Sequence, residues 1–291
     1  MKIWKVGKVK ITQLLEISVN GELDMLLPDA KPEVLLQHDW LFPDHVSPSG
    51  NLKLNIQTFA IETPSMKIIV DTCAGNGRKR MPLAVLDELE TDFLPSLISA
   101  GFAPESVDRV VCTHLHADHV GWNTRRMNNK WVPTFPNARY LFGKDEFLNT
   151  AKENEKTPQS AREIVNAAVF EDSLKPVIDA SLVELVESDH VICEEVSMFP
   201  TPGHTHGHVS ILIRSEGEEA IITGDAIHHP CQLIYPQWCC YVDESPQDAI
   251  KSRLSMLERA VKEPSPLLIG THFSGQIAGT IVRDKGTYRL V

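Results

Sequence analysis

The segment THLHADHVGW, residues 113–122, concentrates side chains that can bind a metal ion. Three histidines and one aspartate fall within six residues, at His114, His116, Asp118 and His119. Imidazole nitrogens and carboxylate oxygens together suit zinc, and also iron, manganese or cobalt. The apolar run before the segment predicts a short buried strand, so these ligands would lie in a loop at a strand end. The spacing therefore predicts a metal site.

Three more ligand-type residues follow other buried apolar runs. They are His204 in TPGHTHGH, Asp225 in IITGDAIHH and His272 in LLIGTHF. The resulting seven ligand-type residues are too many for one tetrahedral ion and enough for two. Two ions about 3.5–4 Å apart would share Asp225 and hold a hydroxide between them. We therefore expect two divalent metal ions, Zn²⁺ first and Fe, Mn or Co as alternatives.

The seven other histidines are interpreted differently. His208 is expected to orient the loop that carries His204, whereas the roles of His206 and His229 stay open. His38, His45 and His190 are interpreted as ordinary surface or hydrogen-bonding histidines. The seventh, His228, is considered below.

Hydrophobic periodicity predicts a mixed α/β fold around these loops. Strands are expected as a pair over 2–15 turning at Gly7, as a hairpin of 52–63 and 66–72, and at 108–113, 138–142, 196–201, 208–214, 219–225 and 266–273. Helices are expected over 83–100, in two pieces because of Pro95, and at 143–155, 158–170 and 246–262. We predict one domain over 1–291 with two sheets between outer helices. Residues 25–50, rich in proline and large apolar side chains, are interpreted as a lid or dimer-contact arm.

Composition excludes several classes of protein. The chain has 291 residues, 42% of them hydrophobic, and a net charge of −11, which disfavours nucleic-acid partners. No long apolar run or signal peptide is evident, so neither a membrane span nor secretion is expected and the predicted location is cytoplasmic. Six cysteines without a CxxC pair are interpreted as mostly buried, reduced thiols.

Five motifs, spread over about residues 50–275, resemble those of the metallo-β-lactamase superfamily. They are VDTCAGN (70–76), THLHADH (113–119), TPGHTHGH (201–208), ITGDAIHH (222–229) and GTHF (270–273). The resemblance implies an α/β fold of the αββα sandwich type, with two mixed β-sheets flanked by helices.

The resemblance also implies how the ligands divide between the two ions. The first ion would take His114, His116 and His204. The second would take Asp118, His119 and His272, and Asp225 would bridge. Asp71, at an early strand end, would support the ligands without binding metal.

The same resemblance narrows the activity to lactonases, phosphotriesterases, arylesterases and glutathione thioesterases. True β-lactamases usually lack the bridging carboxylate, and the chain has no room after His272 for the basic segment of the thioesterases. Acyl-homoserine lactonases carry a Tyr three residues after the bridging Asp, where this chain has His228. That departure resembles the phosphotriesterase-type branch.

We therefore predict a binuclear hydrolase in which a metal-bridging hydroxide attacks a lactone or carboxylic ester of a small hydrophobic substrate. Asp118 would orient the hydroxide and carry a proton, and His228 would donate to the oxyanion or leaving group. A homodimer is expected from the resemblance. The alternatives are phosphotriesterase or arylesterase activity and a non-hydrolytic metal-binding or redox protein. The predicted substrate pocket consists of Trp122, Leu233, Tyr235, Trp238 and Phe273.

Overall fold

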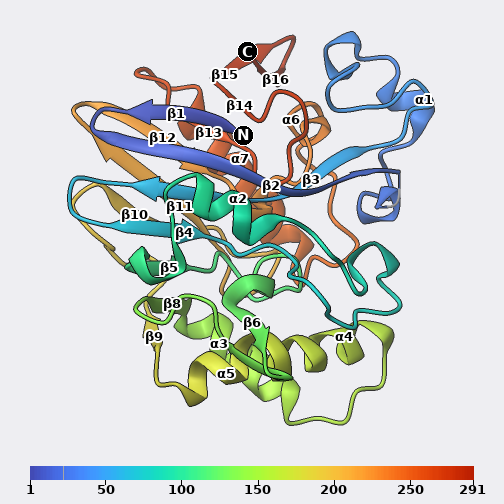
Figure 1. Cartoon of the computed structure of the whole chain (residues 1–291). Helices are drawn as coiled ribbons and strands as arrows, with labels where there is room; N and C mark the ends of the chain where they lie inside the picture. Colours follow the sequence, from blue (N-terminus) through green and yellow to red (C-terminus); the bar gives the residue numbers. More distant parts are fainter. Residues whose placement is uncertain (22) are drawn as a thin grey trace. The chain divides into compact units, whose positions relative to one another are not determined.

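The computed structural model describes residues 1–21 and 23–291, which form two compact units (Figure 1). Unit 1 comprises Met1–Ile17 and Ile56–Glu187. Unit 2 comprises Ser18–Asn55 and Ser188–Val291. Each unit has its own β-sheet and its own apolar core.

Unit 1 is built on a seven-stranded mixed sheet in the order β1-β2-β3-β4-β5-β8-β9. The hairpins β1/β2 and β3/β4 are antiparallel, whereas β4, β5, β8 and β9 run parallel to one another. The strands are β1 (Lys2–Val6), β2 (Val9–Asn20), β3 (Lys53–Glu62), β4 (Lys67–Val70), β5 (Arg109–Val111), β8 (Arg139–Gly143) and β9 (Val183–Val186). Parallel strands bring their carboxyl ends, and the loops that follow them, to one edge of the sheet.

Short helices and one separate hairpin complete unit 1. The α-helices are α2 (Phe93–Ser99), α3 (Lys144–Asn154), α4 (Ala161–Val169) and α5 (Lys175–Asp179), with a π-helical turn, η6 (Phe170–Leu174), between the last two. The 3₁₀ turns are η3 (Ala84–Leu86), η4 (Pro104–Ser106) and η5 (Gly121–Asn123), and the hairpin is β6 (Thr124–Met127) with β7 (Lys130–Pro133). Helix α4 begins with a capping box in which Ser160 and Glu163 bind each other's backbone N–H groups.

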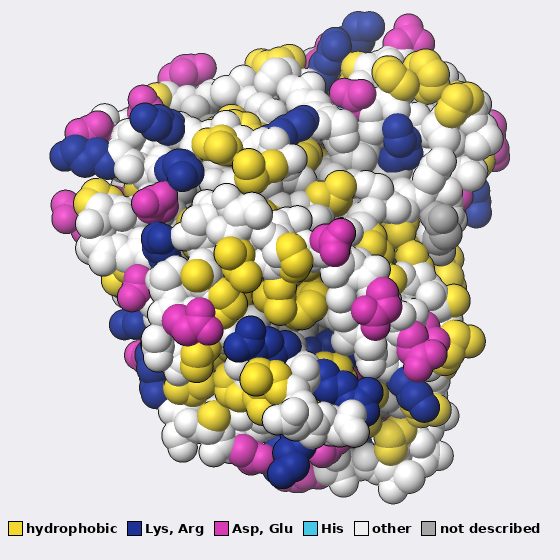
Figure 2. Space-filling model, in the orientation of Figure 1, with side chains coloured by type: hydrophobic (Ala, Val, Ile, Leu, Met, Phe, Trp, Pro, Cys, Tyr) yellow, Lys and Arg dark blue, Asp and Glu magenta, His cyan; other side chains and the backbone are white. Residues whose placement is uncertain are grey.

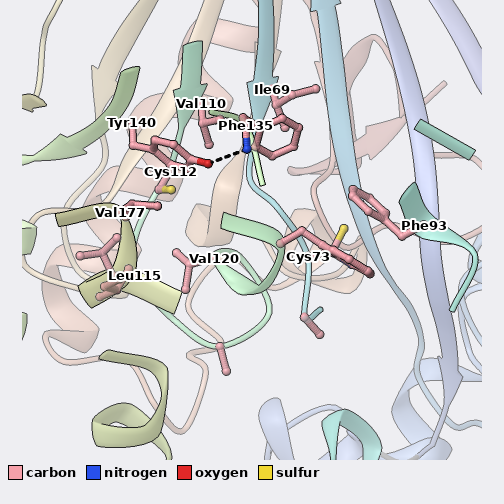
Figure 3. Packing of buried hydrophobic residues seen from close by; sticks show 14 of the residues in the cluster. Ile69, Cys73, Phe93, Val110, Cys112, Leu115, Val120, Phe135, Tyr140 and Val177 are labelled. Atoms are coloured by element: carbon pink, nitrogen blue, oxygen red, sulfur yellow. Dashed lines mark hydrogen bonds between the residues drawn. The ribbon is translucent and has the colours of Figure 1, made fainter. Parts of the chain in front are cut away.

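The core of unit 1 joins these helices to the sheet (Figure 3). Phe93 of α2 and Val177 of α5 belong to the same buried cluster as Val110 of β5 and Tyr140 of β8. The Tyr140 hydroxyl accepts a hydrogen bond from the Phe135 backbone N–H at 3.0 Å, which Figure 3 shows, and donates one to a backbone carbonyl at 2.9 Å. The one polar atom of this buried ring is therefore fully satisfied.

Unit 2 is built on a five-stranded mixed sheet in the order β10-β11-β12-β13-β14. Its strands are β10 (Val196–Pro200), β11 (Val209–Ser215), β12 (Glu218–Ile222), β13 (Leu267–Ile269) and β14 (Ala278–Gly279), with a further hairpin of β15 (Ile281–Asp284) and β16 (Thr287–Leu290). Helix α7 (Pro246–Ala260) buries Met256 and Leu257 in one cluster with Ile221 of β12 and Leu268 of β13. The pair β12/β13 is parallel, and this pairing positions two of the predicted ligands.

The predicted arm, residues 25–50, is a folded part of unit 2. It contains η1 (Asp24–Leu26), α1 (Pro32–Leu35) and η2 (Asp39–Leu41), and it packs in one cluster with α6 (Cys231–Ile234). Leu27, Leu41 and Val46 are each at most 1% exposed, so the arm contributes to the core. Its role as a lid or dimer contact stays a prediction.

Most predicted elements are present, but several observed elements, among them α5 and β9, were not predicted. Within 83–100 only α2 is an α-helix, because the Asp87 side chain accepts hydrogen bonds from the backbone N–H groups of Arg80 and Met81 and holds the chain in a turn. The hairpin β6/β7, whose turn residues Asn128 and Asn129 have positive φ, was not predicted. The strand at 266–273 does not close the chain, since β14, β15 and β16 follow it.

The side chains on the surface and the state of the cysteines agree with what the sequence predicts. Acidic and basic side chains are interspersed with apolar ones on the face in Figure 2. All six cysteines are free thiols, and four of them are buried. Among the residues that the structure describes, no helix has the length and apolarity to cross a membrane.

Tyr140→Phe tests how the core of unit 1 is held together. Removing the hydroxyl leaves the buried Phe135 N–H without its acceptor, so the free energy of unfolding should fall by about 1–3 kcal/mol in urea denaturation. Tyr241→Phe is the control because its side chain is 50% exposed, and it should have no measurable effect. Equal stability of the two variants would contradict the proposed role of the hydroxyl.

Candidate metal centre

The loop after β5 in unit 1 brings four predicted ligands together. His114 Nε2 and His116 Nδ1 lie 3.0 Å apart, and the rings of His114 and His119 lie 4.1 Å apart between centroids. His119 Nε2 is 3.6 Å from Asp118 Oδ2. His114 and His119 are almost fully buried, whereas the Asp118 side chain is 24% exposed. The ring nitrogens and the carboxylate thus face one another within a single loop.

Two buried carboxylates hold this loop in place. Asp71, directly after β4, accepts hydrogen bonds from the backbone N–H (2.7 Å) and hydroxyl (2.9 Å) of Thr113, and His119 Nδ1 lies 2.9 Å from its Oδ2. Glu146, in the first turn of α3, accepts a hydrogen bond from the backbone N–H of Leu115 at 3.0 Å. With Asp71 occupying its Nδ1, His119 directs Nε2 toward Asp118. Glu146 is not among the predicted residues, although its place just after a strand end was a usable signal.

In unit 2, Asp225 lies at the centre of three histidines. Its Oδ2 is 3.4 Å from His204 Nε2 and 3.2 Å from His228 Nε2, and its Oδ1 is 3.1 Å from His272 Nε2. Register explains the pairing with His272: Ile222 of β12 pairs with Ile269 of β13, and the two ligands lie three residues farther on (222 to 225, 269 to 272). Because β12 and β13 are parallel, both side chains come to the same sheet edge.

Backbone and side-chain groups fix the orientation of these ligands. His272 Nδ1 donates to the Asn55 carbonyl at 2.8 Å, which leaves Nε2 to face Asp225. His208 Nε2 accepts from the backbone N–H of Asp225 at 2.8 Å, and His208 Nδ1 lies 3.0 Å from the carbonyl of Thr201. His208 thus contacts the turn after β10 through Nδ1 and the loop of Asp225 through Nε2, and its expected role in orienting the His204 loop stays a prediction.

One carboxylate of unit 2 was missed by sequence reasoning. Asp243 Oδ1 lies 2.8 Å from His204 Nδ1, and burial raises the pKa of this carboxyl. It occurs in an irregular segment 39 residues away from His204, where no strand or spacing pattern draws attention to it. Burial alone would lower the pKa of His228, but the nearby Cys240 and Asp225 raise it well above its ordinary value.

The predicted pocket residues have different environments. Trp122 stacks on Phe93 in the core of unit 1 and donates its indole N–H to Glu16 at 2.6 Å. Burial raises the pKa of Glu16, although its hydrogen bonds act in the opposite direction.

The other predicted pocket residues lie in unit 2. Leu233 and Phe273 are completely buried, whereas the half-buried rings of Tyr235 and Trp238 stack 4.1 Å apart. Tyr235 also lines a cavity of about 700 Å³ together with His38 and nine other residues, all in unit 2. The substrate-contacting role of all five pocket residues stays a prediction.

The donor sets fit a zinc-type metal. Two ligands at about 2.0–2.1 Å from a tetrahedral ion lie about 3.3 Å apart. The separations of 3.0 Å between His114 and His116 and of 3.1 and 3.4 Å around Asp225 agree with that value. All of these atoms are imidazole nitrogens or carboxylate oxygens, the donors that zinc prefers.

Comparison with known families decides what kind of protein carries these loops. Residues 53–266 match the family model described as the metallo-beta-lactamase superfamily. The chain belongs to the metallo-beta-lactamase superfamily. At the level of this family, the predictions of fold and of a metallo-β-lactamase-fold hydrolase are confirmed.

Curated relatives of this superfamily member are distant. An N-acyl homoserine lactonase of Bacillus sp. is 25% identical over 190 residues, which cover 59% of this chain and 63% of that enzyme. An N-acyl homoserine lactonase of Bacillus thuringiensis is 23% identical over 247 residues, which cover 78% of this chain and 84% of that enzyme. The match to the first of these thus spans less than two thirds of the relative's length.

Solved structures share the metallo-β-lactamase fold over nearly the whole chain. The hydrolase AbOPH of the beta lactamase superfamily has a TM-score of 0.80 at 23% identity, with 99% of this chain and 96% of that chain covered. AidC, a dizinc quorum-quenching lactonase in complex with a product, has a TM-score of 0.77 at 17% identity, with 100% and 96% covered. The predicted α/β class with two mixed sheets and flanking helices is therefore confirmed.

Asp71→Ala tests how strongly the ligand loop of unit 1 depends on its buried carboxylate. The variant leaves the Thr113 donors and His119 Nδ1 without an acceptor. The free energy of unfolding of chelator-treated protein, measured by chemical denaturation, should therefore fall by about 3 kcal/mol. Asp29→Ala, at an exposed aspartate, is the control and should stay within about 0.5 kcal/mol of the parent. A loss no larger than that of the control would show that Asp71 does not stabilise the metal-free loop.

Proposed function

We propose that the protein is a binuclear metal-dependent hydrolase that opens lactones or cleaves carboxylic esters of small hydrophobic substrates. The observation that carries this proposal is the position of Asp225. Its two oxygens face different histidines, Oδ2 toward His204 and Oδ1 toward His272. A carboxylate used in this way can serve two ions at once.

The proposed ligand assignment follows the family motifs. His114, His116 and His204 hold one ion, Asp118, His119 and His272 hold the other, and Asp225 binds both. When bound, such a metal pair lowers the pKa of water toward neutrality and polarises the substrate oxygen. Zinc is the first choice, since one similar structure is described as a dizinc lactonase.

Two side chains are proposed to move protons. Asp118 is the one carboxylate of the segment 113–122, its side chain is 24% exposed, and the same segment carries three of the other proposed ligands, so it can hand a proton to the leaving alkoxide. His228 is buried, with Nε2 3.2 Å from Asp225, and is proposed to donate to the oxyanion or the leaving group.

The choice of substrate rests on the relatives and on one departure from them. The curated relatives are named N-acyl homoserine lactonases, and this favours a lactone. The resemblance to acyl-homoserine lactonases as a family implies a Tyr where this chain has His228, and this departure favours the second candidate, a phosphotriesterase or arylesterase.

Metal removal together with His116→Ala tests the metal dependence. Chelator treatment should abolish hydrolysis of an aryl ester and a lactone, and added Zn²⁺ should restore it. His116→Ala should bind about one ion fewer than the parent by elemental analysis and have only the activity of chelator-treated protein. His206→Ala is the control because its ring is 63% exposed and pairs with Glu244, and it should keep both properties.

Either of two results would refute the binuclear hydrolase. Full activity after chelation would exclude a role for the metal. Two bound ions without turnover on esters, lactones or phosphotriesters would favour the non-hydrolytic alternative.

His228→Gln tests the proposed proton donor. The change keeps a polar side chain of similar reach but removes the imidazole that would carry the proton, so kcat on the preferred substrate should fall by about 10²-fold or more while bound metal stays constant. A parallel panel of lactones and phosphotriesters compares kcat/KM for the parent and the variant. Unchanged kcat on every substrate would remove His228 from the scheme, and a parent preference for phosphotriesters would select the second candidate.

A further inference from the structure

We propose that Asp243 is a positioning residue that fixes His204 for metal binding, an inference that rests on the proposed function. The Asp243 side chain is completely buried, His204 is 2% exposed, and Nδ1 and Oδ1 lie 2.8 Å apart. The second carboxylate oxygen of Asp243 accepts a hydrogen bond from the Cys240 backbone N–H at 2.9 Å. Both oxygens are therefore fixed, and the carboxylate cannot turn away from the histidine.

This contact selects one tautomer of His204. Because a carboxylate accepts and does not donate, His204 Nδ1 carries the proton and Nε2 keeps its lone pair. Nε2 is the nitrogen that lies 3.4 Å from Asp225 Oδ2, the side on which metal is proposed to bind. A carboxylate on the far side of a ligand histidine also raises the basicity of the metal-facing nitrogen.

The same device occurs in unit 1, although it is built from unrelated residues. There Asp71 Oδ2 lies 2.9 Å from His119 Nδ1 and leaves Nε2 toward Asp118. A buried carboxylate thus backs one histidine of each unit, whereas His272 is backed by the carbonyl of Asn55.

Backbone hydrogen bonds fasten the segment of Asp243 to the loop of His204. The backbone N–H of Glu244 donates to the His204 carbonyl at 3.1 Å, and that of Ser245 donates to the Gly203 carbonyl at 2.9 Å. Gly203 has φ +136°, and a Cβ there would come within 2.0 Å of the Ala249 backbone nitrogen. The His204 loop therefore lies against the first turn of α7 and is hydrogen-bonded to the segment just before that helix, so the distance from Asp243 to His204 has little freedom to vary.

A direct metal-binding role for Asp243 is the competing explanation. His204, His228, Cys240 and Asp243 each offer a ligand atom, and these atoms lie within 4.8 Å of one another. However, His204 Nδ1 and Asp243 Oδ1 lie 2.8 Å apart, which is the separation of a direct hydrogen bond, so the positioning role accounts for this contact without a further ion.

The test measures metal affinity in Asp243→Ala and Asp243→Asn of the full chain. Competition with a chromophoric chelator gives the Zn²⁺ affinity of each site, and elemental analysis gives the number of bound ions. Asp243→Ala should weaken one of the two sites by about 10–100-fold. Asp243→Asn should have a smaller effect, because the amide oxygen still accepts the Nδ1 proton but carries no charge. Glu244→Gln is the matched control, since it alters the adjacent carboxylate–histidine pair at the exposed His206 and should leave both affinities unchanged.

The outcomes separate this inference from the proposed function. Two sites of parental affinity in both Asp243 variants would overturn the positioning role and leave the binuclear hydrolase standing. A parent protein that binds no Zn²⁺ would overturn both. Loss of a third ion, with two sites unchanged, would show that Asp243 is a ligand and overturn the positioning role. Circular dichroism of chelator-treated variants checks folding, and Asp243→Asn decides the question if the alanine variant does not fold.

Discussion

The pairing of the buried Asp225 carboxylate with its histidines is the constraint on which unit 2 depends. A buried anion is costly unless cations or donors surround it, so the chain must bring His204, His228 and His272 to the same place. The parallel pairing of β12 and β13 does this for His272, and the turn after β10 does it for His204. The sheet of unit 2 therefore positions these ligands at the ends of its strands.

The ligands of both units are supported in the same physical way. Each buried imidazole needs a fixed partner at the nitrogen that does not face the candidate metal side, because otherwise its tautomer and ring orientation are undefined. Asp71, Asp243 and the Asn55 carbonyl fill that place for three histidines. The site is therefore built from pairs of residues, and the support is as deeply buried as the ligands themselves.

The sequence predicts the ligand loops well and their supports poorly, for a physical reason. A ligand at a strand end is preceded by a run of apolar residues, and this pattern marks His114, Asp225 and His272 without any knowledge of the fold. A support such as Glu146 or Asp243 is defined only by its distance from a ligand, and that distance arises from tertiary packing. Asp71 was expected only because the motif VDTCAGN resembles the strand-end motif of the superfamily. The hairpins β6/β7 and β15/β16 were missed, although the turn residues Asn128–Asn129 and Lys285–Gly286, all at positive φ, were the local signal for them.

The equal offset of Asp225 and His272 from their paired strand residues has an evolutionary consequence. A single inserted or deleted residue on either side would shift one side chain along the edge and separate the pair, so these two connections tolerate changes of composition but not of length. Changes of length in related chains should instead occur at exposed turns such as Glu216–Gly217, while the two strand-to-ligand spacings stay constant.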